Sequence, residues 1–470
     1  MSRRAVVIGA GQAGMLAAAA LSRAVDEVVV LDRDGLPDGP EYRKGLPQGR
    51  HAHLLMPGGQ RAMAELLPEV DLRERLLAAG AHDVPLASGM VALTPEGWLH
   101  RWRHDEHRVI TCSRALLDHV VRATVVEQTG VEIRRAEAVG LLGTRERVLG
   151  VRATTTEPTT GSSEVADLDA DFVVDASGRG SRSVRWLAEL GIDGVTEETV
   201  DAGLCNATRI YRVPEGAERF PMTLVQADPY AGAPGRSATV VPIEGNRWMV
   251  SLAGSRGGEP PSDPDGFLQY TLDLPHPLVG QLIEHAEPLT EIAVSRSTSN
   301  ARRYLEKLRA WPEGLLVLGD ALATFNPVYG QGMAVAALGA RALDEELRRG
   351  DLAPGLGRRV QRAAARSVEA AWAMSVGQDV WFPDVRGRGP NAVDRLVTRY
   401  TRRLTKAATG SYAACAALWD VTGLTEGPTR LLRPGALLST LNGPLLPPLS
   451  GPPLTPYERG VLNGLAARAS

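Results

Sequence analysis

Three glycines and one acidic residue near the start of the chain stand at spacings suited to binding a dinucleotide. Gly9, Gly11 and Gly14 lead from an apolar run into an alanine-rich segment, and Asp32 ends the next apolar run. In such a strand, turn and helix, the first glycine permits the tight turn and the second lets the backbone approach a pyrophosphate, while the third lets the helix pack on the strand. The helix N-terminus favours phosphate charge, and the acid about 20 residues further on can bind ribose hydroxyls. Their agreement predicts a bound dinucleotide rather than an empty scaffold.

Two later apolar runs end in turns of the same kind. The run at 171–175 leads into the glycine turn at 176–182. The run at 314–318 leads into Gly319 and Asp320, followed by a glycine-flanked helix start at 326–333. Because the carboxyl ends of parallel strands meet at one edge of a sheet, we expect these turns to converge with the first one. Backbone amides at the later helix start could again meet negative charge.

The loop at 43–53 is dense in charged and histidine side chains, and such loops are usually functional. Phosphates would give Arg43, and Arg33 before the loop, a target. His51 and His53 could share one face of a strand, but no acidic or cysteine partner at a recognised ligand spacing completes a metal site. We therefore expect no bound metal, and three widely spaced cysteines predict free buried thiols.

Composition excludes several classes of function. The formal net charge of −3 and the absence of a basic run predict no nucleic-acid partner. No window of 18 apolar residues lies beyond the N-terminal fingerprint, so we expect no membrane span. Arg3 and Arg4 before an apolar stretch resemble an export signal, but cleavage there would delete the first strand. We therefore expect a cytoplasmic protein.

The rest of the pattern supplies the elements that position these turns. Strands separated by Pro, Gly and Asp clusters follow residue 196, and helices dominate after residue 356. We predict an α/β fold in three parts: a Rossmann-like dinucleotide domain over 1–80, 105–195 and 291–355, an inserted and mostly antiparallel substrate-binding sheet over 81–104 and 196–290, and a C-terminal helical region over 356–470.

The three turns together resemble the FAD-dependent monooxygenases of the hydroxylase superfamily. The resemblance implies that Gly9, Gly11, Gly14 and Asp32 hold the ADP half of FAD. It also implies cofactor contacts by Arg114, early in a helix, by Asp320 of the GD turn, and by the loop that carries Pro327, Gly330, Gly332 and Met333. The middle motif departs from the usual DGxxSxxR, because Ser177 replaces the acid and the arginine falls at Arg185.

A closer resemblance covers most of the chain and points to the flavin epoxidases of ionophore polyether biosynthesis, of the lasalocid and monensin type. It rests on RKGLPQGRHAH at 43–53, CSRALLD at 112–118, VVDASGRGS at 173–181, SLAGSRGGEPP at 251–261 and WPEGLLVLGDALATFNPVYG at 311–330. Gln331 stands where those epoxidases tend to carry histidine. The resemblance implies antibiotic biosynthesis, with O2 activated as a flavin C4a-hydroperoxide that epoxidises alkenes of an apolar, polyketide-like polyene. The flavin carries this chemistry, so we expect no catalytic side chain.

The electron source stays open between NAD(P)H directly and a separate flavin reductase, which would then be a partner. We predict an apolar substrate channel because Trp248 lies in the inserted sheet and Trp372, Trp381 and Phe382 lie in the C-terminal region. An aromatic or terpenoid hydroxylase, an isoprenoid reductase of the same fold and a catalytically silent flavoprotein remain alternatives. A flavin halogenase is disfavoured because the WxWxIP stretch is absent.

Overall fold

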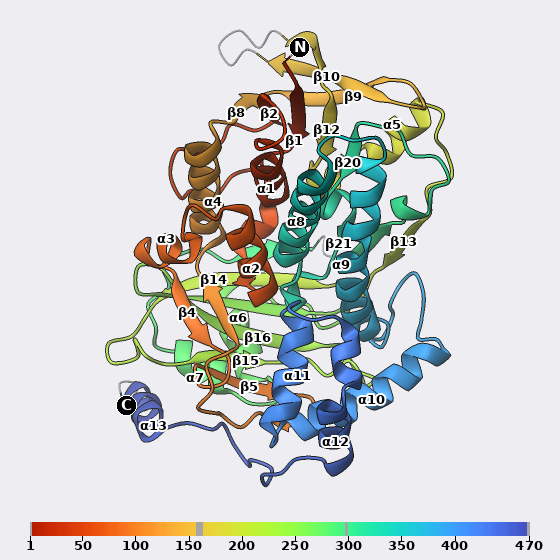
Figure 1. The fold of residues 1–470 in the computed structure, drawn as a ribbon. Coiled ribbons are helices and arrows are strands. Elements are labelled where there is room, and N and C mark those ends of the chain that lie inside the picture. Colours follow the sequence, from red (N-terminus) through yellow and green to blue (C-terminus); the bar gives the residue numbers. More distant parts are fainter. Residues whose placement is uncertain (1, 157–162, 297–298, 468–470) are drawn as a thin grey trace.

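The computed structural model describes residues 2–156, 163–296 and 299–467, and its elements are labelled in Figure 1. A parallel five-stranded sheet in the order β20-β12-β1-β2-β8 forms the upper part of that view. Its strands are β1 (Arg4–Ile8), β2 (Glu27–Asp32), β8 (Glu132–Arg135), β12 (Phe172–Asp175) and β20 (Leu315–Val317). All but the edge strand β8 are buried apolar runs, as parallel strands covered on both faces require.

Helices pack on this sheet and on one another. Every residue of α1 is buried, because alanine side chains let it lie against α4 and α8. The helices of this part are α1 (Gln12–Leu21), α2 (Pro57–Leu66), α3 (Leu72–Ala78), α4 (Arg114–Thr129), α5 (Ser183–Glu189), α8 (Gly332–Gly350) and α9 (Leu356–Asp379). Ser113 caps α4, since its hydroxyl accepts a hydrogen bond from the Leu116 amide at 3.1 Å.

Three small sheets and several short 3-10 helices complete this half of the molecule. The sheets are β9 (Glu137–Gly143), β10 (Val148–Thr156) and β11 (Ser163–Asp169); β13 (Glu197–Val200), β19 (Asn300–Arg303) and β21 (Ala323–Thr324); and β3 (Leu54–Leu55), β4 (His82–Pro85) and β7 (Arg108–Thr111). The 3-10 turns are η1 (Pro47–Arg50), η2 (Gly178–Gly180), η3 (Leu305–Lys307), η4 (Gly319–Ala321) and η5 (Pro327–Tyr329).

The inserted sheet has seven strands in the order β18-β14-β17-β16-β15-β5-β6 and crosses the middle of Figure 1. They are β5 (Met90–Thr94), β6 (Gly97–Trp98), β14 (Cys205–Arg212), β15 (Met222–Val225), β16 (Arg236–Ile243), β17 (Arg247–Gly254) and β18 (Ala293–Ser295). All its pairs are antiparallel except β5 with β15. Gly245 and Asn246 turn the central hairpin with positive φ values of 75° and 53°.

The seven-stranded sheet has two different faces. One is covered by α6 (Pro264–Leu272) and α7 (Leu278–Ile283), which sequence reasoning did not resolve inside the strand-rich region. The other faces α10 (Ala392–Ala408) and α11 (Tyr412–Thr422). Beyond them lie η6 (Pro428–Leu432), α12 (Pro434–Asn442) and α13 (Pro456–Ala467). Within the described ranges, no helix is both long and apolar enough to cross a membrane.

These elements confirm the predicted fold class: a hydroxylase-type α/β fold with an inserted, mostly antiparallel sheet and C-terminal helices. Strand β18 pairs with β14, so the inserted sheet includes residues beyond 290.

Candidate functional site

Two of the three glycines in the first turn are required by the fold of the chain itself, and the third is not. Gly9 has φ 101°, and a Cβ there would lie 2.5 Å from the Ala176 carbonyl oxygen. A Cβ on Gly14 would lie 1.8 Å from the Gly9 oxygen, so only glycine fits at both positions. At Gly11 the nearest atom to a Cβ is Nη2 of Arg43, at 3.5 Å. Gly11 is therefore open on the side where a ligand would approach the N-terminus of α1.

Asp32 is held in place by its own turn and by one arginine. Its Oδ2 accepts the Ala10 amide at 2.8 Å, and its Oδ1 accepts the Asp34 amide at 3.0 Å. Arg43 Nη1 donates to Oδ2 at 3.3 Å, and both side chains are nearly buried. The Nε of Arg43 is buried and has no hydrogen-bond partner in the described chain. Arg43 thus brings an incompletely paired guanidinium beside the glycine turn.

A narrow, basic cavity lies next to this arginine, between α4 and the loop at 37–49. Arg43, Arg114 and Arg122 line it, and Asp118 pairs with Arg114 at 2.7 Å. Burial and the neighbouring Arg43 lower the pKa of Arg122, while Asp118, Asp38 and Asp32 raise it. Glu41 also lines the cavity, so three guanidinium groups stand against two carboxylates, and this excess of positive charge favours an anion such as a diphosphate.

The other two turns converge on Asp320, as the strand order predicts. Turns η2 and η4 contact each other, and Arg179 and Arg114 both act on the Asp320 carboxylate electrostatically. A Cβ on Gly332, at the start of α8, would lie 4.0 Å from Oδ1 of Asp320. Burial raises the pKa of Asp320, and within the described residues its carboxylate makes no hydrogen bond or ion pair. It is a partly exposed acceptor without a protein donor.

The loop after Asp320 is fixed to α9 by a buried polar network. Asp379 accepts hydrogen bonds from Asn300 Nδ2 at 2.7 Å, Asn326 Nδ2 at 3.0 Å and the Tyr329 hydroxyl at 2.8 Å. Gly330 follows in the left-handed region, with φ 68°. Sequence reasoning missed Asp379, because nothing in the local pattern of α9 links it to a loop about 50 residues earlier. Arg179 was also missed, although it stands in the predicted middle turn.

His51 and His53 are both neutral imidazoles, but they carry their proton on different ring nitrogens. The His51 Nδ1 lies 2.8 Å from the Thr208 hydroxyl, which lies 2.6 Å from that of Ser251, and Ser251 accepts the Ala52 amide at 2.9 Å. The hydroxyl protons of Thr208 and Ser251 and the amide proton of Ala52 all find an acceptor in this series only if Ser251 donates to Thr208 and Thr208 donates to His51. The Nδ1 of His51 is then an acceptor, so its imidazole proton lies on Nε2. His53 Nδ1 lies 2.7 Å from the His51 carbonyl, which can only accept, so its Nε2 is an acceptor.

The buried His51 predicts a pH dependence of stability. Burial lowers its pKa to about 4, whereas an unfolded chain would bind the proton near pH 6.5. Between pH 6.5 and about 4 the unfolded state binds more protons than the folded state. The contribution of His51 to stability is therefore full above pH 6.5 and is lost as the pH falls towards 4. Between about pH 7 and pH 4.5, this proton binding should lower the free energy of unfolding of the natural protein by about 2 to 3 kcal/mol. The His51→Gln variant should lack this part of the decrease. Urea unfolding of both proteins measures it, and identical pH slopes would contradict it.

The aromatic residues expected to line a channel divide into two groups. Trp248 is 2% exposed and packs beside Phe220 in the cluster under α6 and α7, on the sheet face away from the glycine turns. Trp372 is buried in the core around the five-stranded sheet. Both are core residues, which corrects the expectation, because strand alternation and helix phase turn them inwards.

Trp381 and Phe382 do lie where the inserted sheet meets the C-terminal region. The indole of Trp381 meets Tyr230 edge-on at 5.8 Å, and its buried Nε1 has no partner among the described residues. Phe382 packs against Gly235, where a Cβ would come within 2.3 Å of its ring. The inserted sheet therefore contributes Tyr230 here rather than Trp248.

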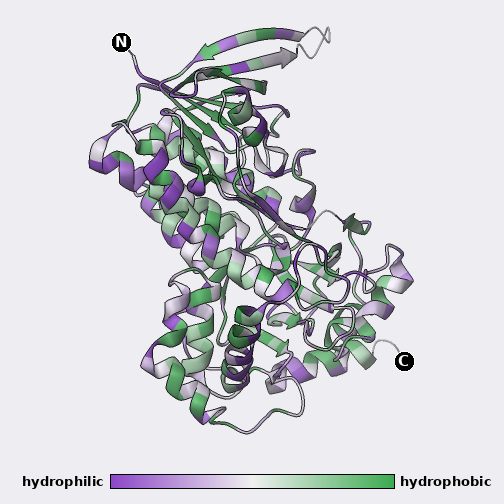
Figure 2. Cartoon of the chain, turned by 90° about the vertical axis from the view of Figure 1, so that its right-hand side faces the viewer, coloured by the Kyte–Doolittle hydropathy of each residue, from purple (hydrophilic) through white to green (hydrophobic). Residues whose placement is uncertain are grey.

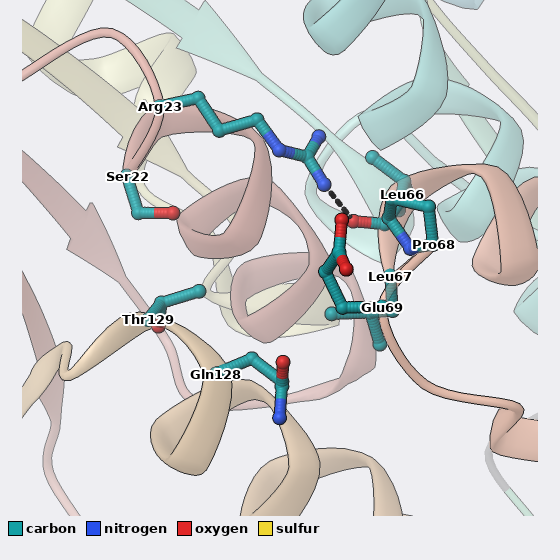
Figure 3. A pocket seen from close by; sticks show the side chains of 8 residues that line it. All are labelled: Ser22, Arg23, Leu66, Leu67, Pro68, Glu69, Gln128 and Thr129. Carbon is teal, nitrogen blue, oxygen red and sulfur yellow. Dashed lines mark hydrogen bonds between the residues drawn. The ribbon is translucent and has the colours of Figure 1, made fainter.

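The other predicted side chains are placed as follows. Met333 is buried at the start of α8, and Pro327 begins η5. Arg33 is 63% exposed and lies 3.9 Å from Asp34, so it does not join the basic cavity, contrary to expectation. A second cavity, of about 230 Å³, lies near Ser22, at the opposite end of α1 from the glycine turn (Figure 3). This cavity therefore lies away from the candidate site. Within its lining, Arg23 donates a hydrogen bond to the Leu66 carbonyl.

These contacts fit FAD. The open Gly11 turn and the incompletely paired Arg43 suit its diphosphate, Asp32 suits the ribose, and the unpartnered Asp320 suits a hydroxyl donor of the ribityl chain. The described residues contain no group of three or more ligands that could hold a metal ion.

Comparison with known proteins assigns the chain to an FAD-binding family. The family model described as an FAD binding domain matches residues 3–349, so the chain belongs to this FAD-binding family, which includes flavin monooxygenases. Protein Rv3254 of Mycobacterium tuberculosis is 31% identical over 393 residues, or 80% of each chain. Kynurenine 3-monooxygenase of Salinispora tropica is 29% identical over 357 residues, covering 73% of this chain and 72% of the relative. The structure of flavin-dependent brominase Bmp2 matches with TM-score 0.63 at 14% identity, covering 93% and 97% of the two chains, which shows a shared fold.

Proposed function

We propose that this flavoprotein is a monooxygenase that epoxidises alkenes of a long, apolar polyene. The observation that carries this proposal is the composition of the sheet face towards α10 and α11. Ile210, Val241 and Met249 pack there against Leu404 and Cys415 in a buried apolar cluster, next to Thr208 of the same face, which bonds His51. Burial raises the pKa of the Cys415 thiol to about 12, so it stays neutral. A site bordered by such a surface favours an apolar substrate over an anionic one.

The side chains around the site would position reactants and exclude water. FAD, when bound, supplies the electrons that activate O2, and NAD(P)H or a separate reductase would restore them. Arg43, Arg114 and Asp320 would hold the cofactor, and the network at Asp379 would hold the loop from Asn326 to Gly330 against it. His51 can donate a hydrogen bond from its Nε2–H to an oxygen atom while it stays neutral, because Thr208 satisfies its other nitrogen. A dry, apolar boundary protects the activated oxygen from water.

A hydroxylase is the second candidate, and the similarity to kynurenine 3-monooxygenase favours it. An isoprenoid reductase on the same fold would reduce its substrate without consuming O2. Oxygen uptake coupled to product formation therefore separates the reductase from both monooxygenases.

A homologous series of polyenes tests the substrate class. Each extra buried methylene should contribute roughly 0.8 kcal/mol, so affinity should rise about fourfold per methylene until the longer chains no longer fit. Flavin fluorescence titration measures this affinity, and saturated analogues of equal length serve as controls that bind but give no epoxide. Faster turnover of small polar phenols than of any polyene would replace the epoxidase by the hydroxylase.

A further inference from the structure

Helix α10 is apolar on one stripe along its whole length, but only its second half is buried. Leu404 packs against the seven-stranded sheet. Val393, Leu396 and Val397, on the same stripe two to three turns earlier, are 68%, 72% and 51% exposed. Asn391 and Asp394 form a capping box, so these exposed turns have a well-defined start. Helix α10 reaches outwards at the lower right of Figure 1, where its first turns meet solvent.

Neighbouring segments extend this exposed surface. The Tyr400 hydroxyl of α10 lies 3.5 Å from the Thr440 hydroxyl of α12 and donates to the Leu431 carbonyl. We call the exposed set the C-terminal apolar surface; it consists of Val393, Leu396, Val397, Leu432, Leu437, Leu438, Leu441, Leu445 and Leu446. Figure 2 looks onto this side, and its lower helices carry hydrophobic and hydrophilic segments next to each other. Surface leucines at this density mark a contact site rather than ordinary surface.

The C-terminal apolar surface lies beside several positively charged side chains that have few acidic neighbours. Arg395, Arg399 and Arg403 follow one another at four-residue spacing along α10, and all three are exposed. Within the described ranges, the guanidinium groups of these three arginines form no hydrogen bond or ion pair. Residues 391–446 hold seven Arg or Lys and three acids. Those acids are engaged: Asp394 with Arg388, Asp420 with Arg430, and Glu426 with Arg433.

This charge distribution decides between two occupants. A second copy of the chain in a twofold dimer would place the same surface against itself. The unpaired arginines would then face a surface equally poor in free carboxylates. An anionic lipid surface supplies both partners, because its acyl region takes leucine side chains while its phosphates take the arginines.

We propose that the C-terminal apolar surface docks on an anionic phospholipid membrane, with α10 and α12 lying in the interface. The buried side of α10 borders the sheet face at which the proposed polyene would lie. A membrane-docked enzyme could therefore take an apolar substrate from the bilayer, and this last step rests on the proposed function. The docking itself does not.

Vesicle co-sedimentation of the full, FAD-loaded chain tests the proposal. We expect binding to phosphatidylglycerol vesicles and much weaker binding to phosphatidylcholine vesicles. Replacing Arg395, Arg399 and Arg403 by Gln should weaken partitioning roughly a hundredfold at low salt, at about 1 kcal/mol per arginine. Replacing Leu396, Leu438 and Leu441 by Ser should abolish binding to either vesicle.

Matched controls separate docking from general surface effects. Leu149→Ser with Val165→Ser removes two exposed apolar side chains from the β9–β11 sheet, far from this surface in Figure 1, and should leave vesicle binding unchanged. No binding by the natural chain would overturn the proposal, and so would a dimer that the leucine variant converts to a monomer. Vesicle binding without polyene turnover would overturn the proposed function and leave the docking intact.

Discussion

Gly11→Val should fold normally and yet retain no FAD. In the structure a side chain at Gly11 first meets Nη2 of Arg43 at 3.5 Å, an ordinary contact, so the apoprotein loses little stability. The same side chain would occupy the space in which a diphosphate approaches the N-terminus of α1. We expect a colourless protein with the melting temperature of the natural apoprotein. Absorbance of the purified protein and thermal unfolding of both apoproteins measure the two effects.

Two other glycines make the test specific. A Cβ on Gly35 would meet open space, and this glycine lies on an exposed loop, so Gly35→Val should keep its FAD. Gly14→Val should fail to fold, because its Cβ would lie 1.8 Å from the Gly9 oxygen. Normal FAD content in Gly11→Val would show that the diphosphate lies elsewhere.

Asp320→Ala should weaken FAD binding tenfold to a hundredfold without destabilising the apoprotein. Loss of one charge-assisted hydrogen bond to the cofactor costs roughly 1.5 to 3 kcal/mol. The carboxylate is partly exposed and has no donor among the described residues, so removing it breaks no contact in the apoprotein. Titration of apoprotein with FAD and urea unfolding of the apoprotein measure the two quantities separately.

Asp175 offers the contrasting variant. It is fully buried and accepts hydrogen bonds from the Ser177 amide at 3.0 Å and the Ser181 hydroxyl at 2.6 Å. Asp175→Ala leaves these donors unpaired and should lower the melting temperature strongly. If Asp320→Ala instead destabilised the apoprotein and kept its FAD affinity, Asp320 would be a structural residue.

The cofactor turns could be predicted from sequence because each lies within one short segment. Gly9, Gly11, Gly14 and Asp32 are linked by a strand, a helix and a second strand whose apolar patterns are unambiguous. The convergence of the Asp320 turn with the turn at 176–182 followed from the rule that parallel strands end at one edge. In each case local periodicity and one topological rule were sufficient.

The substrate side could not be predicted in the same way. Trp248 and Met249 are adjacent in sequence, yet strand alternation sends them to opposite faces, and only the packing of α6 and α7 shows which face is which. Asp379 acts on Asn326 through tertiary contact alone. Arg33 was chosen for its position after Asp32, but its side chain turns to solvent.

Product analysis under isotopically labelled O2 tests the central claim most directly. The FAD-loaded chain, a reductant and a candidate polyene should give an epoxide that carries one labelled oxygen atom for each alkene oxidised, with the oxygen of labelled water absent. Oxygen drawn from water, or a reduced product without any new oxygen, would contradict a monooxygenase.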